Sequence, residues 1–322
     1  MNKDSIPPHV QLAIMSRDYV VSRAIHAIAH LGIADHMSEQ PIAVRELAHL
    51  TSTIPDLLDR ILSFLSNYGL FIKNGDAYAL TPLSAPLRQD HPNSMQDVLS
   101  MVDESWWQAF AQLETTLKTG TTAFKIQHGL EFFDFLNQNP EKKIRFQKGI
   151  SKLSALDDKA ITQGYNFGQF KSLTDIGAGY MELSRAIKEQ YPSISVTLFN
   201  LIEHISKYPT NDYFLSLEKT EAYLLKGILH DFDDEKVIRI LIDCYQNMPM
   251  HSSLIVAEQV IPDNDLPHTN KTMDIVMMVL LGGQQRKLKD WYELIETTGF
   301  KLKNTYPTQG IYTIMEFLKD YP

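Results

Sequence analysis

The second half of the chain, from residue 171 on, alternates between strand-like and helical patterns, and this alternation constrains the fold more than any other feature. The apolar runs typical of strands are 171–177, 193–200, 222–229, 253–261, 300–306 and 311–317. Helical spacing occurs between them at 182–190, from about Asp234, around 273–281 and at 288–298, which Gly299 follows as a helix-ending glycine. Alternating strands and helices are typical of a parallel sheet, so the pattern predicts an α/β fold.

The first ninety residues indicate a different arrangement, in which short helices precede a hairpin. Apolar residues recur at helical spacing in 21–28 and 57–65, and a shorter helix is expected between them at 44–50. Asn74-Gly75 separates two strand-like pieces within 70–81, which is a strong hairpin signal. Helix, helix and hairpin in this order predict a winged helix. We therefore expect two domains, at 1–100 and 101–322.

A winged helix can dock on DNA or serve as a packing and dimerisation element. Residues 41–90 carry four basic and five acidic side chains, which is the wrong balance for a surface that faces phosphates. The whole chain is also acidic, with 30 basic and 39 acidic residues and a formal net charge of −9. We therefore expect no nucleic-acid partner. The apolar helix around 21–28 exceeds what a small domain buries alone, so we expect a homodimer.

The number of cysteines and the hydropathy of the chain indicate its cellular location. The single cysteine, Cys244, excludes an intrachain disulfide and fits a reducing environment. The N-terminal MNKDSIPPH lacks the apolar stretch of a signal peptide, and no apolar run is long enough to cross a bilayer. We expect a cytoplasmic protein without a membrane partner.

The segment 92–165 is helical in pattern and rich in aromatic residues. They are Trp106, Trp107, Phe110, Phe124, Phe132, Phe133 and Phe146. Most are expected in the core, since aromatic side chains are large apolar groups, and a subset could line a flat ligand pocket. The sequence leaves both roles open.

The segment TDIGAGYM at 174–181 is typical of a strand that breaks into a Gly-x-Gly turn and opens a helix. Gly177 and Gly179 suit such a turn, because a ligand can approach the backbone closely where no side chain intervenes. Asn200 ends the next strand, at the place where nucleotide-binding folds usually hold an acidic residue for ribose hydroxyls. An ordinary tight turn gives the same glycine pattern, so both interpretations stay open here.

Longer motifs extend over nearly the whole chain. They are YLLKGILHDFDDE at 223–235, LIVAEQVIP at 254–262 and LLGGQQR at 280–286, preceded by AHLGIADHM at 29–37, VRELA at 44–48, LLDRILSFLSNYGLF at 57–71 and YALTPLS at 78–84. In this order they resemble the caffeate and hydroxyindole type of S-adenosylmethionine-dependent O-methyltransferase. The resemblance implies an N-terminal helical, winged-helix dimerisation domain, a Rossmann-like methyltransferase domain, S-adenosylmethionine as cofactor, no metal, and a hydroxylated aromatic small molecule as methyl acceptor.

The resemblance places the general base on His230 and an orienting carboxylate on Glu258. A phenol has a pKa near 10, so a histidine with an unperturbed pKa near 6.5 can accept its proton while neutral at pH 7. A carboxylate beside an imidazole fixes its tautomer and stabilises the imidazolium. The alternatives are a structural histidine and an exposed carboxylate at a strand end. Asp231 is expected either to touch a substrate hydroxyl or to cap the helix that begins near Asp234, a cap that one of Asp231, Asp233 and Asp234 should supply.

Three further residues match family positions. Lys226 matches a lysine that approaches the cofactor, and Met277 and Met278 lie in a segment that lines the acceptor pocket in relatives. The alternatives are an exposed lysine at a strand end and methionines that fill gaps in the core.

Four features depart from the family pattern. Met181 stands where a third small residue is usual, and Asn200 replaces an aspartate. No Gly-Asp-x-Phe motif lies between Asn200 and Tyr223, and Gln285 replaces the glutamate of GG-x-E-R. Two hypotheses follow. One is an O-methyltransferase with a remodelled cofactor site, and the other is a non-methylating descendant that acts as a binding or scaffold dimer or uses the pocket for another reaction.

The Asn200 departure generates a test. If S-adenosylmethionine lies over the glycine turn with its ribose near Asn200, Asn200→Asp should tighten binding by about 1 kcal/mol, because a charged hydrogen bond is stronger than a neutral one. Calorimetric titration measures the dissociation constant, and Asn304→Asp adds the same charge outside the motifs as a control. Unchanged or weaker binding in Asn200→Asp would show that the site does not use this position.

Overall fold

The computed structural model describes residues 6–177, 182–201 and 217–319. The chain divides into two compact units. One contains the chain up to Asp103 together with Pro140–Lys152, and the other contains Glu104–Asn139 and the chain from Leu153 on. Helix α10 (Pro140–Gly164) therefore begins in the first unit and ends in the second. The domain ranges expected from the sequence, 1–100 and 101–322, stay a prediction.

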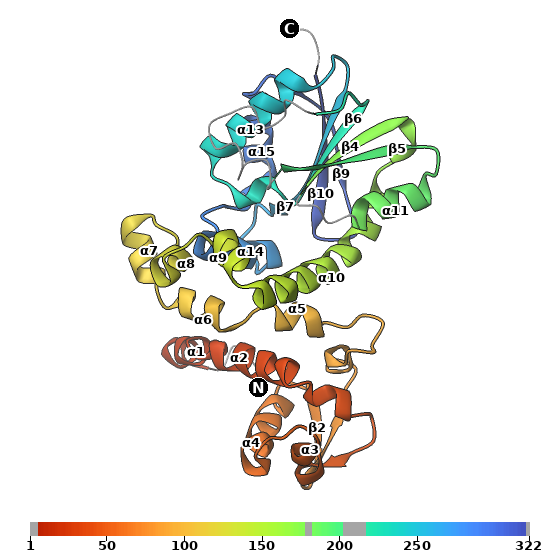
Figure 1. Ribbon diagram of the computed structural model, residues 1–322. Helices are drawn as coiled ribbons and strands as arrows, with labels where there is room; N and C mark the ends of the chain where they lie inside the picture. Colours follow the sequence, from red (N-terminus) through yellow and green to blue (C-terminus); the bar gives the residue numbers. More distant parts are fainter. Residues whose placement is uncertain (1–5, 178–181, 202–216, 320–322) are drawn as a thin grey trace. The chain divides into compact units, whose positions relative to one another are not determined.

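The first unit consists of short helices and a small antiparallel sheet (Figure 1). Its elements are α1 (Pro8–Met15), α2 (Asp18–His30), η2 (Ile33–His36), β1 (Ile42–Ala43), α3 (Val44–Leu50), α4 (Pro55–Ser66), β2 (Phe71–Asn74), β3 (Ala77–Leu80), η3 (Ala85–Leu87) and α5 (Gln96–Ser100). The strands lie in the order β1-β3-β2. Gly75 closes the hairpin with a φ of +64°, a conformation that favours glycine. The predicted order of helix, helix and hairpin is confirmed.

Helix α4 shows how the sequence pattern becomes packing in this unit. Leu58, Leu62 and Leu65 recur at helical spacing and are buried in a core shared with α2, α3 and the hairpin. On the adjoining strip of the same helix, Leu57 is 51 % exposed and Ile61 is 36 % exposed. The unit therefore fills one core and still presents apolar side chains on its surface.

The second unit is built on a seven-stranded sheet. Its elements are α6 (Glu104–Phe110), α7 (Leu113–Thr119), α8 (Ala123–His128), α9 (Phe132–Gln138), η4 (Phe167–Gln169), β4 (Ser172–Gly177), α11 (Glu182–Gln190), β5 (Ser195–Asn200), β6 (Ala222–Lys226), η5 (Leu229–Asp231), α13 (Asp234–Asn247), β7 (Ser253–Ile261), α14 (Thr269–Leu280), β8 (Arg286–Lys287), α15 (Leu288–Glu296), β9 (Lys301–Pro307) and β10 (Tyr312–Leu318). The strand order is β5-β4-β6-β7-β10-β9, and β8 pairs with β7.

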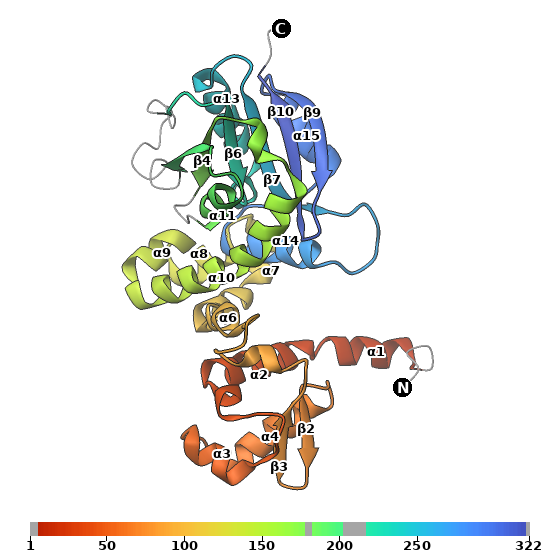
Figure 2. The same ribbon diagram turned by 90° about the vertical axis from the view of Figure 1, so that its right-hand side faces the viewer.

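Helices cover both faces of this sheet, with α13 and α15 on one side and α11 on the other (Figures 1 and 2). Alternation along β6 explains the two cores: Tyr223 and Leu225 pack toward α13 and α15, whereas Leu224 packs toward α11. A sheet covered on both faces leaves its strand ends as the places where a ligand can reach it. The predicted Rossmann-like α/β architecture is confirmed.

Two details differ from the sequence expectations. The strand expected over 222–229 ends at Lys226, because Gly227 turns the chain with a φ of +59°. A Cβ at Gly227 would lie 2.9 Å from the Tyr312 hydroxyl, so the close approach also requires glycine. The sheet is mixed rather than purely parallel, since β10 runs antiparallel to both β7 and β9.

The aromatic residues of 104–139 pack mainly with one another. Phe124 and Phe132 are buried, with ring centroids 5.1 Å apart, and Trp106 and Phe135 make edge contacts with them. These helices contact α14, which in turn contacts β7. Of the seven aromatic residues that the sequence analysis expected mostly in the core, Phe124 and Phe132 are buried and the other five are half-buried. Within the described ranges, no helix is both long and apolar enough to cross a membrane.

Candidate active site

The predicted site residues gather at the carboxyl ends of adjacent parallel strands. Gly177 ends β4 and lies opposite Asn200, which ends β5. Lys226 ends β6 and pairs in register with Ala257 of β7, the residue before Glu258. Parallel pairing thus brings to one edge residues that are far apart in the sequence.

Glu258 holds both His230 and the loop that carries it. Its carboxylate is fully buried, and Oε2 lies 2.6 Å from His230 Nδ1. Oε1 accepts hydrogen bonds from the backbone N–H groups of Ile228 (3.1 Å) and Leu229 (2.9 Å). Because a carboxylate accepts only, Nδ1 carries the proton, which leaves Nε2 as the nitrogen able to accept one.

Asp231 lies on the other side of the imidazole. Its Oδ1 is 3.3 Å from His230 Nε2, and both side chains are largely buried. Helix α13 is capped by Asp233, whose Oδ1 accepts a 2.8 Å hydrogen bond from Lys236 N–H. Of the two roles expected for Asp231, the helix cap therefore belongs to Asp233 instead.

The environment of His230 changes its pKa strongly. Burial by itself lowers the pKa of the imidazole, but the charges of Glu258 and Asp231 and the hydrogen bond to Glu258 raise it to about 9, against the opposing charge of Arg286. Burial raises the pKa of Asp231 to about 6, and the imidazolium opposes that rise. The expectation of an unperturbed histidine near 6.5 is wrong, because it ignored two carboxylates brought close only by the fold.

Residues 282–286 hold the loop that carries His230 in place through hydrogen bonds and close backbone packing. Gln284 N–H donates to the His230 carbonyl at 2.9 Å, and Arg286 Nη2 donates to the Phe232 carbonyl at 3.0 Å. A Cβ at Gly283 would lie 2.1 Å from the His230 carbonyl oxygen, so the backbones pack too closely for any side chain. Gln285 N–H donates to Asp274 Oδ1 of α14 at 2.8 Å, which joins this segment to α14.

Lys226 makes an ion pair that the sequence did not indicate. Its Nζ lies 2.7 Å from Asp158 Oδ1 on α10, also bonds Ser154, and sits 5.3 Å from the centroid of the Tyr312 ring. Burial raises the pKa of Asp158, and the charge of Lys226 lowers it. Asp158 precedes Lys226 by 68 positions, and no spacing or motif signal could have paired them.

Gly177, which begins the predicted glycine turn, has few described atoms near its backbone. A Cβ built at Gly177 would find only Asp175 Oδ1, 3.6 Å away, among the described atoms. Asp175 is buried and accepts a hydrogen bond from Ser184, and burial raises its pKa to about 6. Gly179 and Met181 lie outside the described residues. The same holds for most of the segment between Asn200 and Tyr223, where the family motif is missing.

The two methionines lie on α14 as expected. Met277 is buried and Met278 is half-buried, and the helix contacts α6, α8 and β7. Their part in binding an acceptor stays a prediction.

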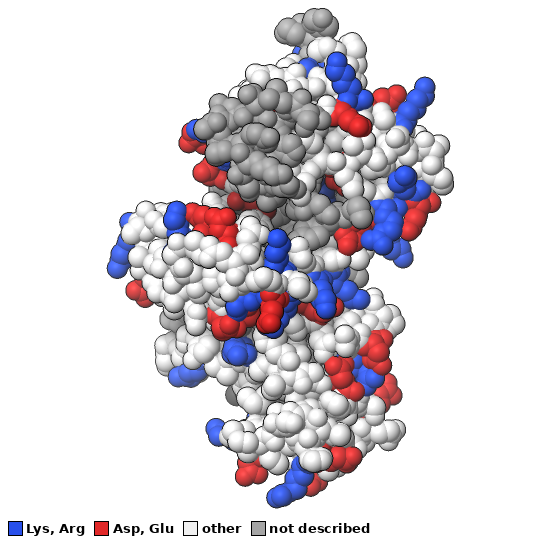
Figure 3. All heavy atoms as spheres, viewed as in Figure 1, with Lys and Arg blue, Asp and Glu red and all other residues white. Residues whose placement is uncertain are grey.

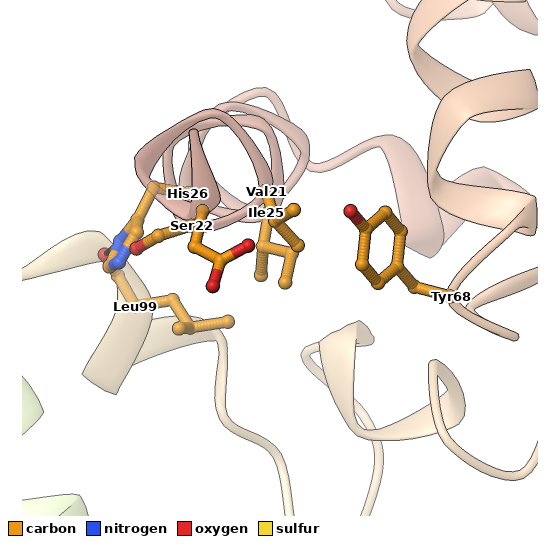
Figure 4. Close-up of a pocket in the computed structure, with 7 residues that line it drawn as sticks. Val21, Ser22, Ile25, His26, Tyr68 and Leu99 are labelled. Atoms are coloured by element: carbon orange, nitrogen blue, oxygen red, sulfur yellow. Dashed lines mark hydrogen bonds between the residues drawn. The ribbon is translucent and has the colours of Figure 1, made fainter. Parts of the chain in front are cut away.

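The first unit contains a separate pocket of about 430 Å³ on α2 (Figure 4). Tyr68 lies on one side of it and Leu99 and His26 on the other, with Val21 and Ile25 between them. Most of this lining is apolar, and the residues belong to the segment that the sequence predicts to pack or dimerise.

Comparison with known proteins places the chain in a family. An O-methyltransferase domain model matches residues 110–301, and an O-methyltransferase dimerisation domain model matches 14–90. The chain belongs to the O-methyltransferase family. Phenazine O-methyltransferase PhzM of Lysobacter antibioticus is 31 % identical, over 97 % of this chain and 96 % of that protein. The predicted family, enzyme class and S-adenosylmethionine dependence are confirmed.

Solved structures agree with the fold. The crystal structure of LaPhzM has a TM-score of 0.86 and 31 % identity, and covers 97 % of this chain and 99 % of that one. Human N-acetylserotonin methyltransferase in complex with S-adenosylmethionine has the same fold, with a TM-score of 0.86, 19 % identity and full coverage of both chains. Similarity therefore extends over both units of this O-methyltransferase.

The perturbed histidine gives a prediction that NMR can test. The His230 imidazole should titrate near pH 9, and Asp231→Asn should lower its pKa, because one of the carboxylates that favour the charged form is removed. Since the folded-state pKa is raised, the pairing should stabilise the fold fully below about pH 6.5, and this contribution should disappear as the pH rises through about 9. Asp233→Asn is the control and should leave the histidine titration unchanged.

Proposed function

We propose that this O-methyltransferase transfers a methyl group to a hydroxyl of an aromatic small molecule, with His230 as general base. The observation that supports this proposal is the His230–Glu258 pair at the carboxyl edge of the sheet. His230 Nδ1 is hydrogen-bonded to Glu258, and His230 Nε2 points away from that carboxylate. Relatives named for phenazine and for 3-amino-4-hydroxybenzoate substrates support an aromatic acceptor.

The residues present fit S-adenosylmethionine. Among the described atoms, only Asp175 Oδ1 lies within 4 Å of a Cβ built at Gly177, and Asn200 ends the neighbouring strand, where its amide suits ribose hydroxyls. Three buried or half-buried carboxyl groups (Asp157, Asp158 and Asp175) share one ammonium, Lys226, so their surroundings favour a cation. When bound, the cofactor supplies an electrophilic methyl group on a positively charged sulfur. Gly179 is proposed as a further contact.

His230 Nε2 takes the proton of the acceptor's hydroxyl, which makes the oxygen nucleophilic toward the methyl group that S-adenosylmethionine would supply. The proton ends on the imidazole, and the resulting imidazolium lies between Glu258 and Asp231, whose charges stabilise it. A base with a pKa of about 9 is close to a phenol's pKa of about 10, so the proton transfer is nearly balanced. In this scheme Asp231 contacts the same hydroxyl, since its Oδ1 already lies beside Nε2.

The alternative is a chain that binds aromatics without methylating them. The Asn200 replacement favours it, because the cofactor position loses a charge. Calorimetry with S-adenosylhomocysteine separates the two hypotheses: binding supports the methyltransferase, and the absence of binding supports the alternative.

We also propose a homodimer formed through the first unit. Helices α1 and α2 expose a run of apolar side chains, namely Val10, Leu12, Ile14, Met15, Tyr19 and Val20. The pocket of Figure 4 lies on α2, a helix that the dimerisation model covers. Exposed apolar area of this kind is stabilised by burial against a partner. Basic and acidic side chains intermingle on the face shown in Figure 3, and we propose neither a nucleic-acid nor a membrane partner.

Removing the base tests the mechanism. His230→Ala should lower kcat about 10²- to 10⁴-fold, and Glu258→Gln should lower it less, since the imidazole remains but loses its orienting charge. Wild-type kcat/KM should rise about tenfold from pH 7 to pH 8 and about fivefold more by pH 9, because only about 1 % of an imidazole with this pKa is neutral at pH 7 and about half is neutral at pH 9. S-adenosylhomocysteine affinity of His230→Ala is the control and should stay unchanged. Wild-type turnover in His230→Ala would refute the mechanism.

The dimer is tested by light scattering. The protein at micromolar concentration should have twice the 36.8 kDa mass of one chain. Replacing Leu12 and Met15 by Glu should produce a monomer, because buried unpaired charges oppose association. The same two substitutions at Leu117 and Leu266, exposed in the second unit, should leave the dimer intact.

A further inference from the structure

A buried ion pair between Lys226 and Asp158 lies at the carboxyl edge of the sheet. Lys226 is the last residue of β6, and its Nζ lies 2.7 Å from Asp158 Oδ1 on α10. The two side chains are 11 % and 4 % exposed. The Ser154 hydroxyl accepts a hydrogen bond from the same ammonium, and the centroid of the Tyr312 ring lies 5.3 Å from Nζ. Contacts from α10 and β10 therefore fix the position of the Lys226 charge.

The strand order places this pair between the two halves of the proposed reaction. Strand β6 lies between β4, which ends at Gly177, and β7, which carries Glu258. The proposed cofactor position is at the end of β4, and the proposed base, His230, is held by Glu258. A methyl group that passes from the first position to the second crosses the end of β6, where Lys226 lies. The net charge of the ion pair is therefore felt where the methyl group is transferred.

This net charge matters because the methyl donor is a cation at sulfur. An unpaired ammonium repels a sulfonium, whereas an ion pair without net charge does so only weakly. Coulomb interactions act over several ångströms and are weakly screened where water is excluded, so the effect requires no direct contact with Lys226. S-adenosylhomocysteine has a neutral sulfur and otherwise lacks only the methyl group. Comparing the two ligands therefore isolates the effect of the charge.

We propose that Asp158 neutralises Lys226 so that the site admits a positively charged methyl donor, and that this ion pair sets the preference between S-adenosylmethionine and S-adenosylhomocysteine. The proposal rests on the proposed function, which puts a sulfonium at this edge of the sheet. The carboxyl groups of Asp157 and Asp175 also interact electrostatically with the Lys226 ammonium. With that ammonium neutralised, they attract the cationic donor, and the uncharged product gains nothing from them.

Calorimetric titrations without acceptor give the dissociation constants of S-adenosylmethionine and S-adenosylhomocysteine for each variant. Asp158→Asn keeps the size of the side chain and removes its charge, which leaves the ammonium without its counter-charge. The affinity for S-adenosylmethionine should then fall about tenfold relative to the affinity for S-adenosylhomocysteine. Lys226→Met removes the opposite charge and should shift the ratio of the two affinities about tenfold in the other direction.

The double variant, Asp158→Asn with Lys226→Met, restores the net charge of the wild-type pair. Its ratio of affinities should lie within about twofold of the wild-type ratio, although the ion pair is gone. A purely structural role would weaken both ligands alike and leave the ratio unchanged in every variant. Thermal unfolding checks that each variant folds. If the unpaired lysine prevents Asp158→Asn from folding, Lys226→Met and the double variant decide the test.

Glu316→Gln is the matched control. Glu316 is fully buried and paired with Lys303 at 2.9 Å, but it lies at the opposite edge of the sheet, where Ser253 at the start of β7 donates to it. Breaking this pair should leave the ratio of affinities as in wild type. An unchanged ratio in the Asp158 and Lys226 variants, an equal shift in Glu316→Gln, or no binding of either ligand to wild type would overturn the proposal.

Methyl transfer is scored separately, by the mass of the product when S-adenosylmethionine and a panel of hydroxylated aromatic compounds are added to wild type. If no compound is methylated while the ratio of affinities follows the charges of the pair, the proposed function fails and the role of Asp158 stands. If product forms while the ratio stays unchanged in every variant, the role of Asp158 fails and the proposed function stands.

Discussion

A single buried carboxylate organises the candidate site. Glu258 is fully buried, and its two oxygens accept three hydrogen bonds, two from the backbone of the loop and one from the His230 ring. A buried charge is tolerated only when its hydrogen-bonding capacity is used in this way, and removing a partner from such a pair typically costs about 3–5 kcal/mol. The turn after β6, the tautomer of the imidazole and the direction of Nε2 all depend on this one group.

The place of Glu258 in the sheet explains why a buried carboxylate is tolerated there. Apolar residues cover both faces of β6 and β7, so water reaches neither strand from above or below. Glu258 follows Ala257 at the carboxyl end of β7, where Gly227 has already turned the neighbouring chain away. A charged group at that edge can meet a loop from the adjacent strand, whereas the same group two residues earlier would lie in the core without partners.

The charges around His230 have two opposing effects on its role as a base. Glu258 and Asp231 raise the pKa of the imidazole to about 9, which makes it a stronger base for a phenolic proton and reduces the neutral fraction at pH 7.

The sequence by itself determined the architecture and the family, and its motifs supplied the candidate site residues. Strand-helix alternation gave the α/β unit, Asn74-Gly75 gave the hairpin, and the motifs around His230 and Glu258 identified the family, because these signals are local or follow directly from strand order. Tertiary structure decided what the side chains do electrostatically: the pairing of Lys226 with Asp158 and the carboxylates that shift the pKa of His230. Those outcomes depend on distances of a few ångströms between residues remote in the chain, and on exclusion of water, neither of which a one-dimensional pattern contains.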